Sequence, residues 1–263
     1  MIFINLFIFF ILGTIIGSYI NVVVLRYHTG RSSVTGRSQC FSCGKTLSWY
    51  ELVPIFSFLF LNGKCLGCNS RISYQYPIVE FITGILFLGI ASKIGLSLFL
   101  PLYLVIASVL VAISAYDFKH KIILNEMVYL FDVLAIIVLF FHQGTYLFSM
   151  PGLLDLLAGP ILFLFFALLW AVSSGRWMGF GDAKLALGVG WLLGFSGGIL
   201  AIMMAFWIGA AWGIGAIVLQ KISLSRLGLT IKSQVPFAPF IILGLFLQFF
   251  TGWGILTIIN TLN

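Results

Sequence analysis

The first apolar stretch decides the fold: residues 2–25 read IFINLFIFFILGTIIGSYINVVVL and contain no charged side chain. A helix that crosses a membrane needs about 20 such residues. No basic segment precedes the stretch, so we expect it to be retained and not removed as a signal peptide. Further apolar runs cover Tyr76–Ser92, Leu96–Tyr116, Ile122–Phe141, Leu153–Val172, Ala183–Phe195, Gly197–Leu219 and Val235–Ile259. The sequence therefore predicts an all-α polytopic membrane protein with about eight transmembrane helices.

The composition of the whole chain agrees with this fold class. Of its 263 residues, 61% are apolar and 8% are charged, whereas an ordinary soluble domain has about 25% charged residues. A soluble protein of this composition would expose large apolar patches. The composition therefore argues against a soluble enzyme and predicts contact with membrane lipid.

The positions of the basic residues predict the orientation. With the N-terminus outside, the cytoplasmic connections carry every one of the 14 lysines and arginines except Lys93, as the positive-inside rule requires. Orientation and anionic lipid also account for the net charge of +7, so we expect no nucleic-acid partner.

The one long polar connection, residues 26–75, contains all four cysteines as two CxxC pairs. Two such pairs about 20 residues apart are typical of a four-thiolate zinc site, here formed by Cys40, Cys43, Cys65 and Cys68. A redox role for one CxxC pair is the alternative, while disulfides do not suit the cytosol. We expect the zinc to be structural, because a loop of this size has too little core to fold alone. The predicted organisation is a first helix over 1–25, a zinc-binding cytoplasmic loop domain over 26–75 and a membrane domain over 76–263.

Two of the seven acidic residues lie at predicted cytoplasmic ends of spans. Asp117 closes the third span, and Asp182 opens the sixth after Gly179-Phe180-Gly181. Two carboxyl groups at one site share a proton, so one acts as an acid and the other as a base, and together they activate water against an amide. Two other interpretations stay open: ordinary interfacial charges with no catalysis, and a transporter that uses acids within the membrane. The transporter would use Asp132, Asp155 and Glu80, and a non-catalytic chain would be a zinc-scaffolded adaptor.

The sequence resembles the type IV prepilin peptidases, which are membrane aspartic proteases of the GxGD class. The similarity runs over most of the chain and is carried by seven segments and the two cysteine pairs. The segments are Gly17–Val22, Gly36–Gly44, Leu47–Pro54, Ile72–Glu80, Asp117–Lys119, Gly179–Lys184 and Val235–Phe240. The chain departs from the family at Leu124, where a proline is usual, and at Ala238, where a glycine is usual.

This resemblance implies an activity, and it implies that Asp117 and Asp182 are the catalytic pair. The substrates would be type IV prepilins or pseudopilins, cleaved after a basic leader on the cytoplasmic face of a bacterial inner membrane. Members with the cysteine loop also methylate the new N-terminal residue with S-adenosylmethionine. No dinucleotide-type glycine motif is present, so we expect the loop and nearby helix ends to form that pocket, with Glu51 and Glu80 as candidate cofactor-binding residues.

Overall fold

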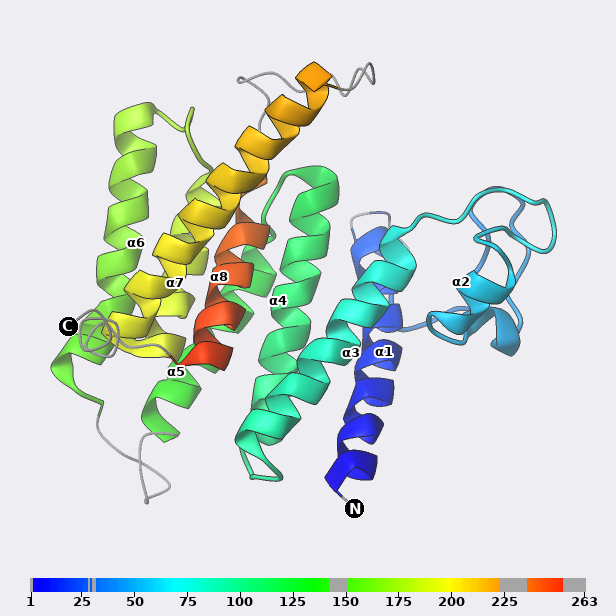
Figure 1. Ribbon diagram of the computed structural model, residues 1–263, viewed down its shortest axis with the longest axis horizontal. Coiled ribbons are helices and arrows are strands. Elements are labelled where there is room, and N and C mark those ends of the chain that lie inside the picture. The colour runs from blue at the N-terminus through cyan, green and yellow to red at the C-terminus, as the bar shows by residue number, and fades with distance from the viewer. Residues whose placement is uncertain (1, 28, 30–31, 142–150, 223–235, 253–263) are drawn as a thin grey trace. The chain divides into compact units, whose positions relative to one another are not determined.

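A computed structural model describes residues 2–27, 29, 32–141, 151–222 and 236–252. These residues form α-helices, one short 3₁₀ helix and two isolated β-bridges (Figure 1). Five helices are long and apolar enough to cross a membrane: Leu6–Arg26, Gln75–Ile94, Leu100–His120, Leu153–Ser173 and Phe180–Ala216. The all-helical membrane fold expected from the sequence is thus confirmed.

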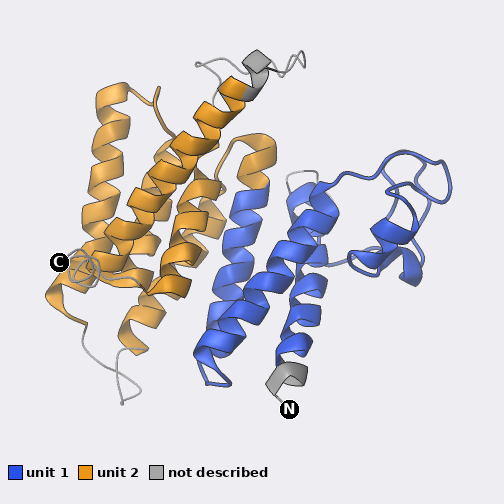
Figure 2. Cartoon of the chain, in the orientation of Figure 1, with its two compact units in different colours: residues 1–115 blue, residues 116–263 orange. Residues whose placement is uncertain are grey.

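The chain divides into two compact units, Met1–Ala115 and Tyr116–Asn263 (Figure 2). The first unit contains α1 (Ile2–Arg26), η1 (Trp49–Leu52), α2 (Phe56–Phe60) and α3 (Gln75–Ile94). The helix α4 (Leu100–His120) runs across the boundary. The second unit contains α5 (Asn125–Phe141), α6 (Leu153–Ser173), α7 (Phe180–Ile222) and α8 (Ala238–Thr251).

In the first unit, α1 and α3 form a closely packed hairpin. Glycines permit the close approach: a Cβ atom on Gly17 would lie 2.7 Å from Glu80 Cα, and one on Gly13 would lie 2.6 Å from the Thr83 carbonyl oxygen. The side-chain amide of Asn21 donates to the Tyr76 carbonyl at 3.2 Å, which ties the loop-side ends of the helices together. The loop over residues 27–74 therefore leaves and re-enters the hairpin at neighbouring points.

In the second unit, α7 is the central helix, and α5, α6 and α8 each pack against it. The two apolar runs predicted over 183–195 and 197–219 form one helix of 43 residues that bends at Gly194 (φ 71°, ψ −178°). The bend divides α7 into two helical segments, so the described residues form eight apolar helical segments besides the five-residue α2. The predicted eighth span extends to Ile259, and its part beyond Gly252 lies outside the described residues.

Candidate functional site

The position of Asp117 is fixed by the end of α4. Asp117 lies in the last turn of α4 and is only 4% exposed. The helix ends where Lys121 adopts a left-handed conformation (φ 56°) and donates its backbone N–H to the Asp117 carbonyl at 2.7 Å. The backbone N–H of Ala238, the first residue of α8, donates to the Asp117 carboxyl group. Two helix ends, the last turn of α4 and the first residue of α8, thus meet at Asp117.

Asp182 lies in the first turn of α7 and is also 4% exposed. Its Oδ2 accepts a hydrogen bond from the Gly179 N–H at 3.2 Å, and its own N–H donates to the Gly179 carbonyl at 3.2 Å. Close packing explains why residue 181 of the segment Gly179-Phe180-Gly181-Asp182 is a glycine. A Cβ atom on Gly181 would lie 2.8 Å from Ile123 Cβ. The start of α7 can therefore approach the segment before α5 only without a side chain at residue 181.

The two carboxyl groups lie close enough for the charge of Asp117 to act on Asp182. Each keeps one buried oxygen without a hydrogen-bond partner, Oδ2 of Asp117 and Oδ1 of Asp182. Buried polar atoms are nearly always hydrogen-bonded, so two orphaned carboxyl oxygens in one region indicate a place for a polar ligand. Water held between two such groups can be activated as a nucleophile.

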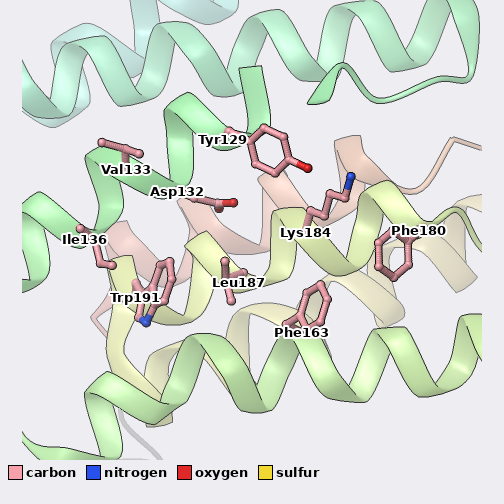
Figure 3. Close-up of a pocket in the computed structure, with 9 residues that line it drawn as sticks. All are labelled: Tyr129, Asp132, Val133, Ile136, Phe163, Phe180, Lys184, Leu187 and Trp191. Carbon is pink, nitrogen blue, oxygen red and sulfur yellow. The ribbon is translucent and has the colours of Figure 1, made fainter. Parts of the chain in front are cut away.

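A separate groove of about 510 Å³ lies on another side of α7 (Figure 3). It is lined mainly by apolar side chains from α5, α6 and α7, with Asp132 and Lys184 as its charged members. Lys184 follows Asp182 by two residues, which places their side chains about 200° apart around the helix. The groove is therefore not the space between the two acids. Lys184 Nζ donates to Asn125 Oδ1 at 2.9 Å and lies over the rings of Tyr129 and Phe180.

The acids of the transporter interpretation have separate surroundings. Asp155 Oδ1 accepts from the Phe195 N–H at 3.1 Å and so caps the second segment of α7. Asp132, on α5, is buried with an unpartnered Oδ1 beside Gly188. Glu80 belongs to the first unit, where its Oε2 accepts from the Ile55 N–H at 2.7 Å. Asp155 therefore has a structural role that its sequence position did not reveal.

The four cysteines form a second candidate site. Their Sγ atoms all lie within 4.8 Å of one another, and those of Cys40 and Cys68 are 3.9 Å apart. Tetrahedral zinc with Zn–S bonds of about 2.3 Å requires S···S distances of about 3.8 Å. The backbone N–H groups of Cys43 and Ser42 lower the pKa of the Cys40 thiol to about 6, which favours the thiolate that binds metal. The cluster thus has the geometry and chemistry of a metal site.

Each cysteine pair lies in a tight turn. The Gly44 N–H donates to the Cys40 carbonyl at 2.9 Å, and the Asn69 N–H donates to the Cys65 carbonyl at 2.9 Å. Both donors are left-handed, with φ of 71° at Gly44 and 54° at Asn69. Asparagine tolerates the left-handed conformation, which is the signal that would have identified Asn69.

A pocket of about 190 Å³ lies between this loop, α1 and α3, and both Glu51 and Glu80 line it. Three hydrogen bonds fix the carboxylate of Glu51. It accepts from the Ser48 N–H at 2.8 Å and from Lys45 Nζ at 3.1 and 3.3 Å. The Ser48 N–H, together with Lys45, lowers the pKa of Glu51. Ser48 and Glu51 form a capping box for η1, a signature that the sequence Ser48-Trp-Tyr-Glu51 already contains.

Comparison with known proteins gives the relationships of the chain. Residues 11–94 match the Bacterial Peptidase A24 N-terminal domain, and residues 104–214 match the Type IV leader peptidase family. The Prepilin leader peptidase/N-methyltransferase of Bacillus subtilis (strain 168) is 33% identical over 95% of this chain and 96% of its own length. The protein of that name from Myxococcus xanthus (strain DK1622) is 37% identical over 69% of this chain and 54% of its own length, so that match spans about half of the relative. No solved structure gave a significant match. The chain therefore belongs to the type IV leader peptidase family.

Proposed function

We propose that this chain removes the leader peptide from type IV prepilin-like precursors, with Asp117 and Asp182 as its catalytic pair. The observation that carries the proposal is the pair of buried carboxyl groups in the second unit, each with an unpartnered oxygen and close enough to interact. The names of the relatives, Prepilin leader peptidase/N-methyltransferase, support the choice of substrate.

In the proposed reaction, one aspartate is ionised and the other is protonated, because two adjacent carboxylates share one proton. The ionised group takes a proton from water while the water oxygen bonds to the scissile carbonyl carbon. The protonated group donates a hydrogen bond to the carbonyl oxygen as negative charge develops on it. The aspartate that took the proton from water then gives it to the amide nitrogen, the C–N bond breaks, and the amine leaves while the leader ends in a carboxyl group.

A second proposed activity is N-methylation of the newly exposed amine. S-adenosylmethionine supplies an electrophilic methyl group on a sulfonium cation. The pocket beneath the loop is lined by the carboxyl groups of Glu51 and Glu80 and by the basic side chains of Arg26 and Arg71. We assign the sulfonium to the side of the carboxyl groups. Glu80 is the stronger candidate for a direct contact, since Glu51 already binds Lys45 and the Ser48 N–H.

The four-cysteine cluster is proposed to hold one structural zinc ion. Four thiolates complete the tetrahedral shell of zinc, so no position is left for substrate or water. The metal therefore orders the loop domain of residues 26–75, while residues 76–263 form the peptidase domain. The N-terminus lies outside a bacterial inner membrane, and the acid pair faces the cytoplasm, in accordance with the basic residues of the predicted cytoplasmic connections.

The experiment is cleavage of a leader-bearing prepilin by the purified full chain in detergent. Asp117→Asn and Asp182→Asn keep the side-chain shape and remove the charge, so each is expected to abolish cleavage. Glu126→Gln is the matched control, because it neutralises another acid in a first helical turn, at the start of α5. If both aspartate variants still cleave the prepilin, the assignment of Asp117 and Asp182 as the catalytic pair is wrong. Mass spectrometry of the mature N-terminus, with and without S-adenosylmethionine, tests methylation separately.

A further inference from the structure

The tetracysteine loop has an unusual surface, because its short helices turn their apolar side chains outward. In α2, Phe56, Leu59 and Phe60 are 60%, 62% and 82% exposed. These residues are spaced i, i+3 and i+4, so they share one face of the helix. Phe58 faces the other way, against the ring of Tyr74.

The neighbouring helix η1 enlarges this surface. It contacts α2, and its Trp49 and Tyr50 are 78% and 49% exposed, with their rings 5.9 Å apart. We refer to Trp49, Tyr50, Phe56, Leu59 and Phe60 as the apolar loop face. Contiguous apolar surface of this kind marks a contact with another molecule or with a membrane.

Hydrogen bonds and packing fix the depth of this face relative to the two spanning helices. Ile55, directly before α2, donates its N–H to Glu80, which is the sixth residue of α3. Glu80 packs against Gly17, which lies nine residues before Arg26 at the end of α1. At 1.5 Å per residue, the start of α2 lies about 8–14 Å back from the helix ends. Figure 1 shows the same arrangement, with α2 level with the loop-side parts of α1 and α3 and not beyond them.

The helix α3 has 20 residues and is therefore about 30 Å long, which is the thickness of the hydrocarbon core alone. A position back from its end therefore lies at or inside the boundary between headgroups and hydrocarbon. Tryptophan and tyrosine favour this boundary because their rings are apolar with one polar edge. Residues 26–75 also contain six basic residues and a single acid. That acid, Glu51, is buried and paired with Lys45. The remaining charge of the loop is thus positive, which complements anionic lipid headgroups.

We propose that the apolar loop face is inserted into the membrane leaflet beside α1 and α3, and that anionic headgroups bind the surrounding basic residues. The loop is then an interfacial domain held at the surface by two features, apolar burial and charge. Lys64 is the cation argued to bind headgroups, since it is exposed and its backbone N–H donates to the carbonyl of Leu61, the residue directly after α2. Arg71, which is also exposed, pairs with Lys64 across an isolated β-bridge and is the second such cation.

The test uses the full chain in lipid nanodiscs with a fluorescent amino acid at residue 60. A second protein carries the same probe at residue 34, because Val34 is 81% exposed in the same loop but lies outside the apolar loop face. Nitroxide-labelled lipid is expected to quench the probe at residue 60 severalfold more than the probe at residue 34. Aqueous iodide is expected to show the opposite order. Equal iodide quenching at the two positions overturns the proposal, and shielding of residue 60 from both quenchers shows a protein contact instead and overturns it too.

The role of charge is tested with the same probe at residue 60. Lipid quenching is expected to rise when anionic lipid is added to zwitterionic nanodiscs, and Lys64→Gln with Arg71→Gln is expected to remove that increase. Quenching that is equal in the two compositions overturns the headgroup contact. A probe at residue 59 repeats the measurement, so that failure of one labelled protein to fold does not decide the result.

Discussion

The carboxylate of Asp155 on α6 accepts a hydrogen bond from the backbone N–H of Phe195, the residue that follows the bend of α7. A bent helix leaves backbone N–H groups without partners at the start of its second segment. Asp155 supplies one acceptor from a neighbouring helix. The bend is therefore stabilised by a contact between α6 and α7.

Asp155→Ala is expected to lower the free energy of unfolding by about 1–2 kcal/mol, because it removes the acceptor from the partly buried N–H group of Phe195. Asp155→Asn keeps an acceptor oxygen and is expected to lose much less. Denaturant-induced unfolding in mixed micelles measures both variants. Equal losses would show that the charge of Asp155, and not the hydrogen bond to Phe195, is what matters.

Gly190→Ala is expected to destabilise the second unit by about 1–3 kcal/mol, because overpacking forces backbone shifts. A Cβ atom at this position would lie 2.6 Å from the Gly159 backbone nitrogen on α6. Gly213→Ala is the matched control in the same helix, since nothing lies within 4 Å of its new Cβ atom. The control is expected to be neutral or slightly stabilising. Thermal unfolding in detergent compares the two, and equal melting temperatures would contradict the packing argument.

Removal of metal is expected to unfold the tetracysteine loop and leave the second unit folded. Cys65→Ser is the sharpest variant, because Cys65 is the buried cysteine of the four. Ser42→Ala is the control, since it lies in the first cysteine turn without belonging to the cluster. Elemental analysis should find about one zinc ion per chain in the control and far less in Cys65→Ser. Limited proteolysis should then cut within residues 27–74. Full metal retention by Cys65→Ser would argue against a four-thiolate site.

Glu51→Ala is expected to loosen the loop more than Glu51→Gln, because glutamine still accepts from the Ser48 N–H. The lowered pKa of Glu51 gives the sign of the pH effect. Its stabilisation is fully present above its unfolded pKa of about 4.3 and is lost as the pH falls through the folded value. The rate at which each variant loses metal to a chelator at pH 7 measures how far its loop is loosened, and Glu51→Ala is expected to lose metal faster than Glu51→Gln. Identical rates for the two variants would contradict the capping role of Glu51.

The sequence predicted the helical membrane fold well, because apolar runs of the length of a membrane are a strong local signal. The family relationship is confirmed, while the catalytic role of Asp117 and Asp182 stays a prediction. The bend at Gly194 was not predictable, since the acceptor that stabilises it lies on another helix. Glu51 shows the opposite case: its capping box with Ser48 can be predicted from the sequence, whereas its role in cofactor binding stays a prediction.

The glycine-mediated approach of α1 and α3 has a consequence for how this chain can vary. The two helices close the base of the intervening segment through their own packing at Gly13 and Gly17, so the segment need not supply that closure itself. A segment with adjacent ends behaves as an insertion, so its outer parts can vary in length and sequence. Ile55 is the exception, because its N–H donates to the buried carboxyl group of Glu80 on α3. The outer part of the loop is in this sense replaceable, whereas the hydrogen bonds from Asn21 to Tyr76 and from Ile55 to Glu80 must be retained.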